Sequence, residues 1–203
     1  MTWTTQPRSK FGQLNAIVSG TGKQLVLIHG VGLRAEAWSE QTSELSKLHK
    51  TVAIDIPGHG ECSIPTDDFS LKDYAELISA AITTPSIIVG HSFGAMIALE
   101  LAFRHSRKVK SVIALNAIFK RDEIAKKAVK NRFNTLSKQS NSDPSSTLNR
   151  WFSPEEKKAR KVCKDWLSST DPRGYYNAYK VFSSEDGPNE NDLNKLHCPS
   201  LFI

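Results

Sequence analysis

Residues 87–102 read IIVGHSFGAMIALELA, and this stretch decides the fold. A β-branched apolar run leads into Gly90-His91-Ser92-Phe93-Gly94, and a helix-forming run follows from Ala95. The two glycines let the backbone turn sharply where a Cβ would collide with a neighbouring helix or strand. The stretch therefore predicts a strand, a tight turn and a helix, with the Ser92 hydroxyl exposed at the carboxyl end of the strand.

Strand and helix signals alternate on both sides of this turn, over residues 1–119. Apolar runs that indicate buried strands lie at residues 25–28, 51–56, 87–89 and 109–115, and an earlier strand is expected at 13–18. One of the helices between them begins at the capping box Ser70-Leu71-Lys72-Asp73. The alternation predicts the α/β class, with a mostly parallel sheet that carries helices on both faces.

The pattern changes at Lys120, after which only helix signals occur until about Phe182. Helix starts are expected at Ser153-Pro154 and Asp171-Pro172, and residues 137–149 are expected to form a loop. Residues 198–203 resemble the beginning of a strand. The predicted organisation is a core at 1–119, a helical cap at 120–190 and the start of a further core segment at 191–203.

Composition narrows the function classes. The chain of 203 residues suits one domain, and it has no apolar run of about 18 residues and no signal peptide, so no membrane partner is expected. Three cysteines without metal spacing indicate reduced thiols in a cytoplasmic protein with no metal site. Residues 120–190 hold 15 Lys/Arg against 10 Asp/Glu, which indicates a solvated helix face or a docking surface for an acidic partner. Aromatic interleaving is weak, so nucleic acid is not expected.

A glycine-rich loop follows the strand at 25–28, as His29-Gly30-Val31-Gly32. An acyl-transfer enzyme needs two amide donors aimed at the tetrahedral oxyanion. The N–H of Phe93, after the nucleophile, and the N–H of Val31 are the expected donors. His29 precedes the serine and is expected to brace the loop, while Asp55 and His59 are expected to hold a tight turn together.

Four pieces of the chain carry a family resemblance: LVLIHGVGL, DIPGHGECS, IIVGHSFGAMIALELA and LHCPSLFI. The sequence resembles the α/β-hydrolase superfamily and its small esterase and lactonase branch, which includes pimeloyl-acyl-carrier-protein methyl ester esterase and 3-oxoadipate enol-lactonase. The resemblance implies a Ser92 nucleophile, oxyanion donors at Val31 and Phe93, and no cofactor. It implies a small ester or lactone substrate, which an acidic carrier protein could deliver to the basic cap. Carbon–carbon bond hydrolysis and cofactor-free perhydrolysis share the scaffold.

The cap would set the specificity of such an enzyme. Its aromatic residues are candidate walls of the substrate pocket, or else simply part of the packing of the cap: Trp151, Phe152, Trp166, Tyr175 and Tyr179.

The sequence departs from the family pattern at the triad. The family's acid lies just past the strand that begins at Ser200, and its histidine lies later still. The six histidines of this chain match no triad-base position, and Asn116 stands where some hydrolases place the acid. We therefore expect a C-terminally truncated fragment, without the last strands and helices, that has little or no triad catalysis by itself. The alternative is a short form that uses the hydrolase fold for binding alone.

Overall fold

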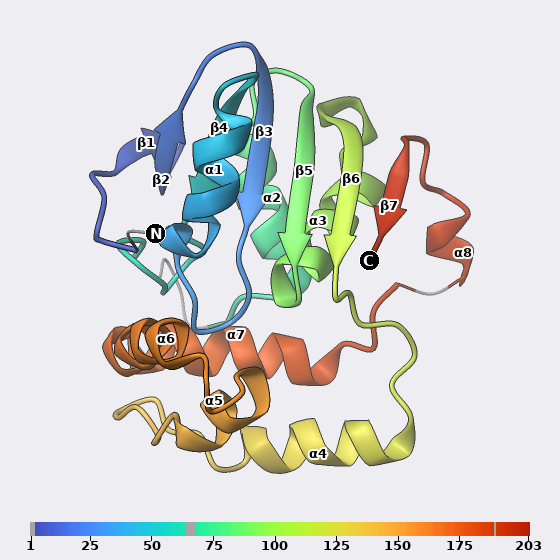
Figure 1. Ribbon diagram of the computed structural model, residues 1–203. Coiled ribbons are helices and arrows are strands. Elements are labelled where there is room, and N and C mark those ends of the chain that lie inside the picture. Colours follow the sequence, from blue (N-terminus) through green and yellow to red (C-terminus); the bar gives the residue numbers. More distant parts are fainter. Residues whose placement is uncertain (1–2, 64–67, 189) are drawn as a thin grey trace.

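The computed structural model describes residues 3–63, 68–188 and 190–203. Within these ranges seven strands form one sheet, in the order β1-β2-β4-β3-β5-β6-β7 (Figure 1). The bounds of the strands are β1 Ser9–Phe11, β2 Leu14–Ser19, β3 Lys23–Ile28, β4 His49–Ile54, β5 Ser86–His91, β6 Val109–Leu115 and β7 Ser200–Phe202. Strands β4, β3, β5, β6 and β7 run parallel to one another, whereas β2 pairs antiparallel with β4 and with β1. The sheet confirms the predicted mostly parallel architecture.

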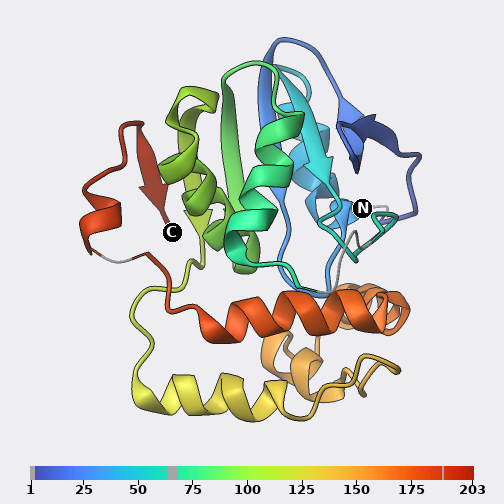
Figure 2. The same cartoon turned by 180° about the vertical axis from the view of Figure 1, so that it is seen from behind.

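Helices lie on both faces of this sheet, as the alternation predicted. The 3-10 helix η1 (Ala35–Trp38) and α1 (Ser39–Leu45) lie on one face, and α2 (Leu71–Ala81) and α3 (Phe93–Arg104) lie on the other (Figures 1 and 2). Strand β3 lies at the centre of the sheet, and its residues from Gln24 to Ile28 are all buried. A continuous buried run of this kind is what a parallel strand covered on both faces requires.

Four helices lie across the carboxyl ends of the parallel strands, and we call them the covering helices (Figure 1). They are α4 (Glu123–Phe133), α5 (Ser145–Trp151), α6 (Lys157–Ser169) and α7 (Pro172–Ser184). The short elements η2 (Ser106–Lys108) and α8 (Glu190–Leu193) complete the described helices. The division into core and cap at residues 119/120 and 190/191 stays a prediction.

Local sequence signals located some helix ends and missed others. Ser70 and Asp73 form the predicted capping box of α2, and Asp171 accepts from the N–H groups of Arg173 and Gly174 at the start of α7. The predicted helix start at Ser153-Pro154 is wrong, because α6 begins at Lys157. The Glu156 carboxylate accepts a hydrogen bond from the Ser153 N–H ahead of the helix. The predicted loop at 137–149 is wrong in its second half, where α5 begins at Ser145.

No helix in the described part of the chain is both long enough and apolar enough to cross a membrane.

Candidate active site

The turn between β5 and α3 holds Ser92 in a strained conformation. Ser92 has φ 54° and ψ −116°, in a region that side-chain-bearing residues rarely occupy. A Cβ at Gly90 would lie 2.1 Å from the Gly94 oxygen, and a Cβ at Gly94 would lie 2.2 Å from the Ile28 oxygen. The glycines are thus required by close backbone approach on both sides of the serine. Strain of this kind persists only where the surrounding structure imposes it, and it concentrates at functional sites.

Two backbone N–H groups beside Ser92 have no partner among the described residues: those of Val31 and Phe93. Phe93 is the first residue of α3, where an N–H has no carbonyl one turn earlier in the helix to bond. The loop that carries Val31 packs on the turn, since a Cβ at Gly30 would lie 3.3 Å from the Ser92 Cβ. Val31 and Ser92 line the same cavity. The role of these two N–H groups as oxyanion donors stays a prediction.

The His29 side chain bonds both to this loop and to the segment that follows β4. Its Nε2 accepts from the Ile56 N–H at 3.2 Å, and its Nδ1 lies 2.8 Å from the Gly30 oxygen. This pairing fixes a neutral tautomer with the proton on Nδ1, and burial lowers the pKa of His29. The ring ties the end of β3 to the end of β4.

A buried charge cluster fixes the next part of the loop, and sequence reasoning missed it. Arg8 donates to the Asp55 carboxylate at 2.7 Å and to both oxygens of Glu36 at 2.6 and 2.8 Å. Asp55 also accepts from the N–H groups of Ala35 and Glu61, which confirms its predicted role in a tight turn. The Arg8, Glu36 and Asp55 side chains are at most 3% exposed, so each charge depends on the others for solvation.

A cavity of about 560 Å³ opens between the turn and the covering helices. It contains Gly30, Val31, His91, Ser92 and Asn116 from the sheet side. From the covering helices come four of the predicted wall residues and several that sequence reasoning missed; the full set is Val129, Thr147, Arg150, Trp151, Phe152, Cys163, Tyr175, Tyr179 and Phe182, and Leu33 completes the lining. The fifth predicted wall residue, Trp166, does not line this cavity.

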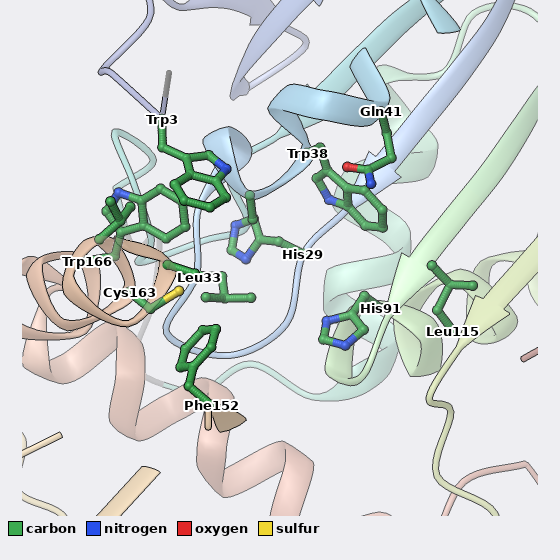
Figure 3. Close-up of a pocket in the computed structure, with 13 residues that line it drawn as sticks. Trp3, His29, Leu33, Trp38, Gln41, His91, Leu115, Phe152, Cys163 and Trp166 are labelled. Atoms are coloured by element: carbon green, nitrogen blue, oxygen red, sulfur yellow. The ribbon is translucent and has the colours of Figure 1, made fainter. Parts of the chain in front are cut away.

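Trp166 lies instead in a neighbouring cavity of about 260 Å³, which shares Leu33, His91, Phe152 and Cys163 with the first. Figure 3 shows Trp166 facing Trp3 from the N-terminal segment, with Phe152 and Cys163 below His29. The side chains that line this smaller cavity are mostly apolar.

Arginine side chains lie near one wall of the larger cavity. Arg150 lines it directly. Burial and the neighbouring Tyr175 raise the pKa of Tyr179, while the positive charges of Arg150, Arg132 and Arg121 oppose that rise. Three guanidinium groups therefore influence one point of the wall. A single arginine beside the predicted aromatic pair Trp151-Phe152 was the available sequence signal.

The described residues place no general base on Ser92. Its Oγ makes no hydrogen bond to any of them. The imidazole of the adjacent residue, His91, has its Nε2 3.5 Å from the Asn116 Nδ2. Burial lowers the pKa of His91. Asn116 itself has φ 50° at the end of β6 and lines the cavity with Ser92.

A strained serine at a strand–helix turn, on a mostly parallel sheet and beneath covering helices, is the arrangement of an α/β-hydrolase. The sequence model of the alpha/beta hydrolase family matches residues 25–194, and the chain belongs to that family.

Among relatives, the chain is 35% identical over 190 residues to (E)-2-((N-methylformamido)methylene)succinate hydrolase of Acinetobacter baylyi, covering 91% of this chain and 72% of that protein. It is 36% identical over 99 residues to a pimeloyl-[acyl-carrier protein] methyl ester esterase of Neisseria meningitidis, covering 49% of this chain and 31% of that protein. Among solved structures, the enol-lactonase from Burkholderia xenovorans has a TM-score of 0.80 at 18% identity, covering 97% of this chain and 79% of that one. The family match confirms the predicted α/β-hydrolase family, the esterase relative supports its esterase branch, and the enol-lactonase shares the fold.

Proposed function

We propose that Ser92 is the nucleophile of a hydrolase that cleaves a small carboxylic ester or lactone. The observation that carries this proposal is the strained Ser92, which lines a cavity together with Val31 and is followed directly by Phe93, where the N–H groups of Val31 and Phe93 have no partner among the described residues. The serine Oγ would attack the carbonyl carbon and pass its proton to a base, and the N–H groups of Val31 and Phe93 would bind the oxyanion. Collapse of this intermediate would release the alcohol, which takes up the proton. Water would then release the acid from the acyl-serine.

The substrate that the cavity favours carries a second, anionic group. Arg150 is a permanent cation in a cavity that five Trp, Tyr and Phe side chains also line. The Acinetobacter baylyi relative is named for a succinate derivative, which is such an anion. An ester with a carboxylate some atoms from its carbonyl would place that carboxylate at Arg150 while Ser92 attacks.

No described residue forms a hydrogen bond with the Ser92 Oγ, so we propose that residues 1–203 lack the base and alone have little triad turnover. The family relative is longer than this chain's match to it, since the match spans 72% of its length. We expect the histidine base in the part of the fold that has no counterpart in residues 1–203. The covering helices would act as the cap, and their basic surface would receive a carrier-bound substrate.

Chemical rescue tests this proposal on the chain as it exists. Imidazole added to the protein can take the proton that a missing histidine would take. With p-nitrophenyl hexanoate, we expect hydrolysis above the imidazole background that requires Ser92 and rises with imidazole concentration. Equal rates for the wild type and Ser92→Ala at every imidazole concentration would leave a binding protein without hydrolase chemistry.

The substrate class has its own test. The mono-p-nitrophenyl ester of adipic acid matches the hexanoate in length and adds a carboxylate. Arg150→Met should lower the rescued rate on the adipate ester about tenfold and leave the hexanoate rate within about twofold, as loss of one charge-assisted contact predicts. Arg160→Met, which removes a surface arginine of α6, is the matched control and should change neither rate.

A further inference from the structure

Two stretches of chain join the sheet to the covering helices, and they run side by side (Figures 1 and 2). Residues 116–121 lead from β6 to α4, and residues 185–188 lead away from α7. The Lys120 backbone N–H donates to the backbone carbonyl oxygen of Asp186 at 3.0 Å. Gly187 has φ 84°, and a Cβ there would lie 1.8 Å from the Ile118 oxygen. The two connections are thus in direct backbone contact.

One side chain fastens this crossing. The Arg121 guanidinium donates to the carbonyls of Phe182, at 2.9 Å, and of Glu185. It also lies 3.6 Å from the Asp186 carboxylate, and its side chain is only 5% exposed. Because α7 ends at Ser184, these carbonyls belong to the last turn, which lacks helical N–H partners. Arg121 therefore caps α7 from the opposite connection.

The same guanidinium holds a wall of the Ser92 cavity. It stacks on the Phe182 ring, 4.6 Å from the ring centroid. The Phe182 ring in turn stands edge-on to the Phe93 ring, with centroids 6.4 Å apart and planes at 89°. Phe93 follows Ser92 directly, and Phe182 lines the cavity with Ser92. A continuous set of contacts therefore runs from the crossing to the turn that carries the serine.

We propose that Arg121 is a positioning residue, which holds the covering helices closed over Ser92 by fastening both connections and seating Phe182 on Phe93. Replacing Arg121 would let α7 move away from the turn and widen the cavity. The consequence for catalysis rests on the proposed hydrolase function, whereas the clasp formed by Arg121, Phe182, Glu185 and Asp186 does not.

Two cysteines report separately on this motion. Cys163, on α6, lies where the two cavities meet and packs near Leu33 and Ala37 of the core side, so opening of the covering helices exposes it. Cys62 lies in the main core cluster, so only a larger unfolding of the core exposes it. Both side chains are buried to the same extent, at 9% exposure. Their alkylation rates, measured by peptide mass mapping with N-ethylmaleimide, therefore separate local opening from global loss of stability.

The variant to test is Arg121→Met, which keeps the apolar stem and removes every hydrogen bond. We expect the Cys163 rate to rise about tenfold or more while the Cys62 rate stays within about twofold. Arg121→Lys keeps the charge near Asp186 but lacks the planar fork that reaches two carbonyls, so it should give most of the increase. Lys126→Met removes the other cation on Asp186, which lies 3.3 Å away, and should leave both rates unchanged.

An unchanged Cys163 rate in Arg121→Met, or a parallel rise at Cys62 and Cys163, would overturn the clasp. If Arg121→Met does not fold, Gly187→Ala disturbs the same crossing through its Cβ and should show the same selective rise at Cys163. None of these rates requires Ser92 chemistry. Failure of imidazole rescue with a selective Cys163 response would therefore refute the hydrolase proposal alone.

Discussion

The Phe182 ring, near the end of α7, stands perpendicular to the Phe93 ring at the start of α3, 6.4 Å away. This pair joins the covering helices to the residue that follows Ser92. Phe93 also contacts Tyr74 of α2 edge-on at 5.2 Å, so the aromatic contacts continue into the core. The position of the covering helices and the position of the serine are therefore set by one packed group of rings.

Truncating Phe182 should enlarge the cavity at Ser92 and leave the contact between the Phe93 and Tyr74 rings in place. Phe182→Ala should raise the ratio of rescued rates on a branched to a linear p-nitrophenyl ester, because the part of the cavity wall formed by the Phe182 ring is lost. Phe182→Leu, which fills much of the space, should give a smaller change. Rates on the two esters that fall together would show that the ring supports stability and does not shape the cavity.

The strain at Ser92 predicts an unusual order of stabilities. Ser92→Gly should have a free energy of unfolding about 1 kcal/mol or more above that of Ser92→Ala, and therefore a higher urea midpoint. The reason is that glycine accepts φ 54° and ψ −116° at little cost. Equal midpoints for the two variants would contradict the strained conformation.

Close backbone approach makes Gly94 intolerant of a side chain. Gly94→Ala places a Cβ 2.2 Å from the Ile28 oxygen, so it should lower the free energy of unfolding by about 3 kcal/mol or abolish folding. Gly30→Ala is the milder comparison, since its Cβ would come no closer than 3.3 Å to a neighbour, the Ser92 Cβ. Urea unfolding of both variants measures the difference, and similar losses would contradict the steric explanation.

Buried neutral His59 should make the fold sensitive to mild acid. Burial and the neighbouring His29 lower the pKa of His59 to about 3, from 6.5. Between these values the unfolded chain binds a proton that the folded chain does not, so stability falls as pH falls. The loss from this group should be about 2 kcal/mol between pH 6.5 and 5. His59→Gln should flatten the dependence measured by urea unfolding, whereas exposed His197→Gln should not.

The Arg8 cluster should matter at lower pH. Burial alone would raise the pKa of Glu36, but hydrogen bonds from Arg8 and from the Gln6 N–H lower it to about 2. Its stabilisation is therefore complete above about pH 4.5 and is lost as pH falls toward 2.

Arg8→Met leaves the buried Asp55 carboxylate without its ion-pair partner and the buried Glu36 carboxylate with Arg34 alone, and should cost about 3–5 kcal/mol at pH 7. Adding Glu36→Gln should recover part of that loss. A double variant no more stable than Arg8→Met in urea would contradict the pairing.

Sequence patterns located what depends on neighbours along the chain. The turn at Ser92, the loop at Val31 and the capping box at Ser70 are each encoded within a few residues. The Arg8 cluster joins residues 28 and 47 positions apart, so no local pattern contains it. The same holds for Arg121, whose partners on α7 lie more than 60 residues away. Trp166 lies on the predicted apolar face of its helix, but that face lines the neighbouring cavity and not the Ser92 cavity. Periodicity predicts which residues share a helix face, but not which part of the molecule that face contacts.

The Ser92 turn also has a consequence for design. The close contacts that impose it involve the backbones of Gly90, Gly94 and Ile28, and none of them uses the serine hydroxyl. A cysteine or an aspartate at position 92 would occupy the same half-buried place at the cavity. The backbone of this turn could therefore hold a thiolate or a carboxylate at the cavity in place of the serine hydroxyl, without a change in the rest of the fold.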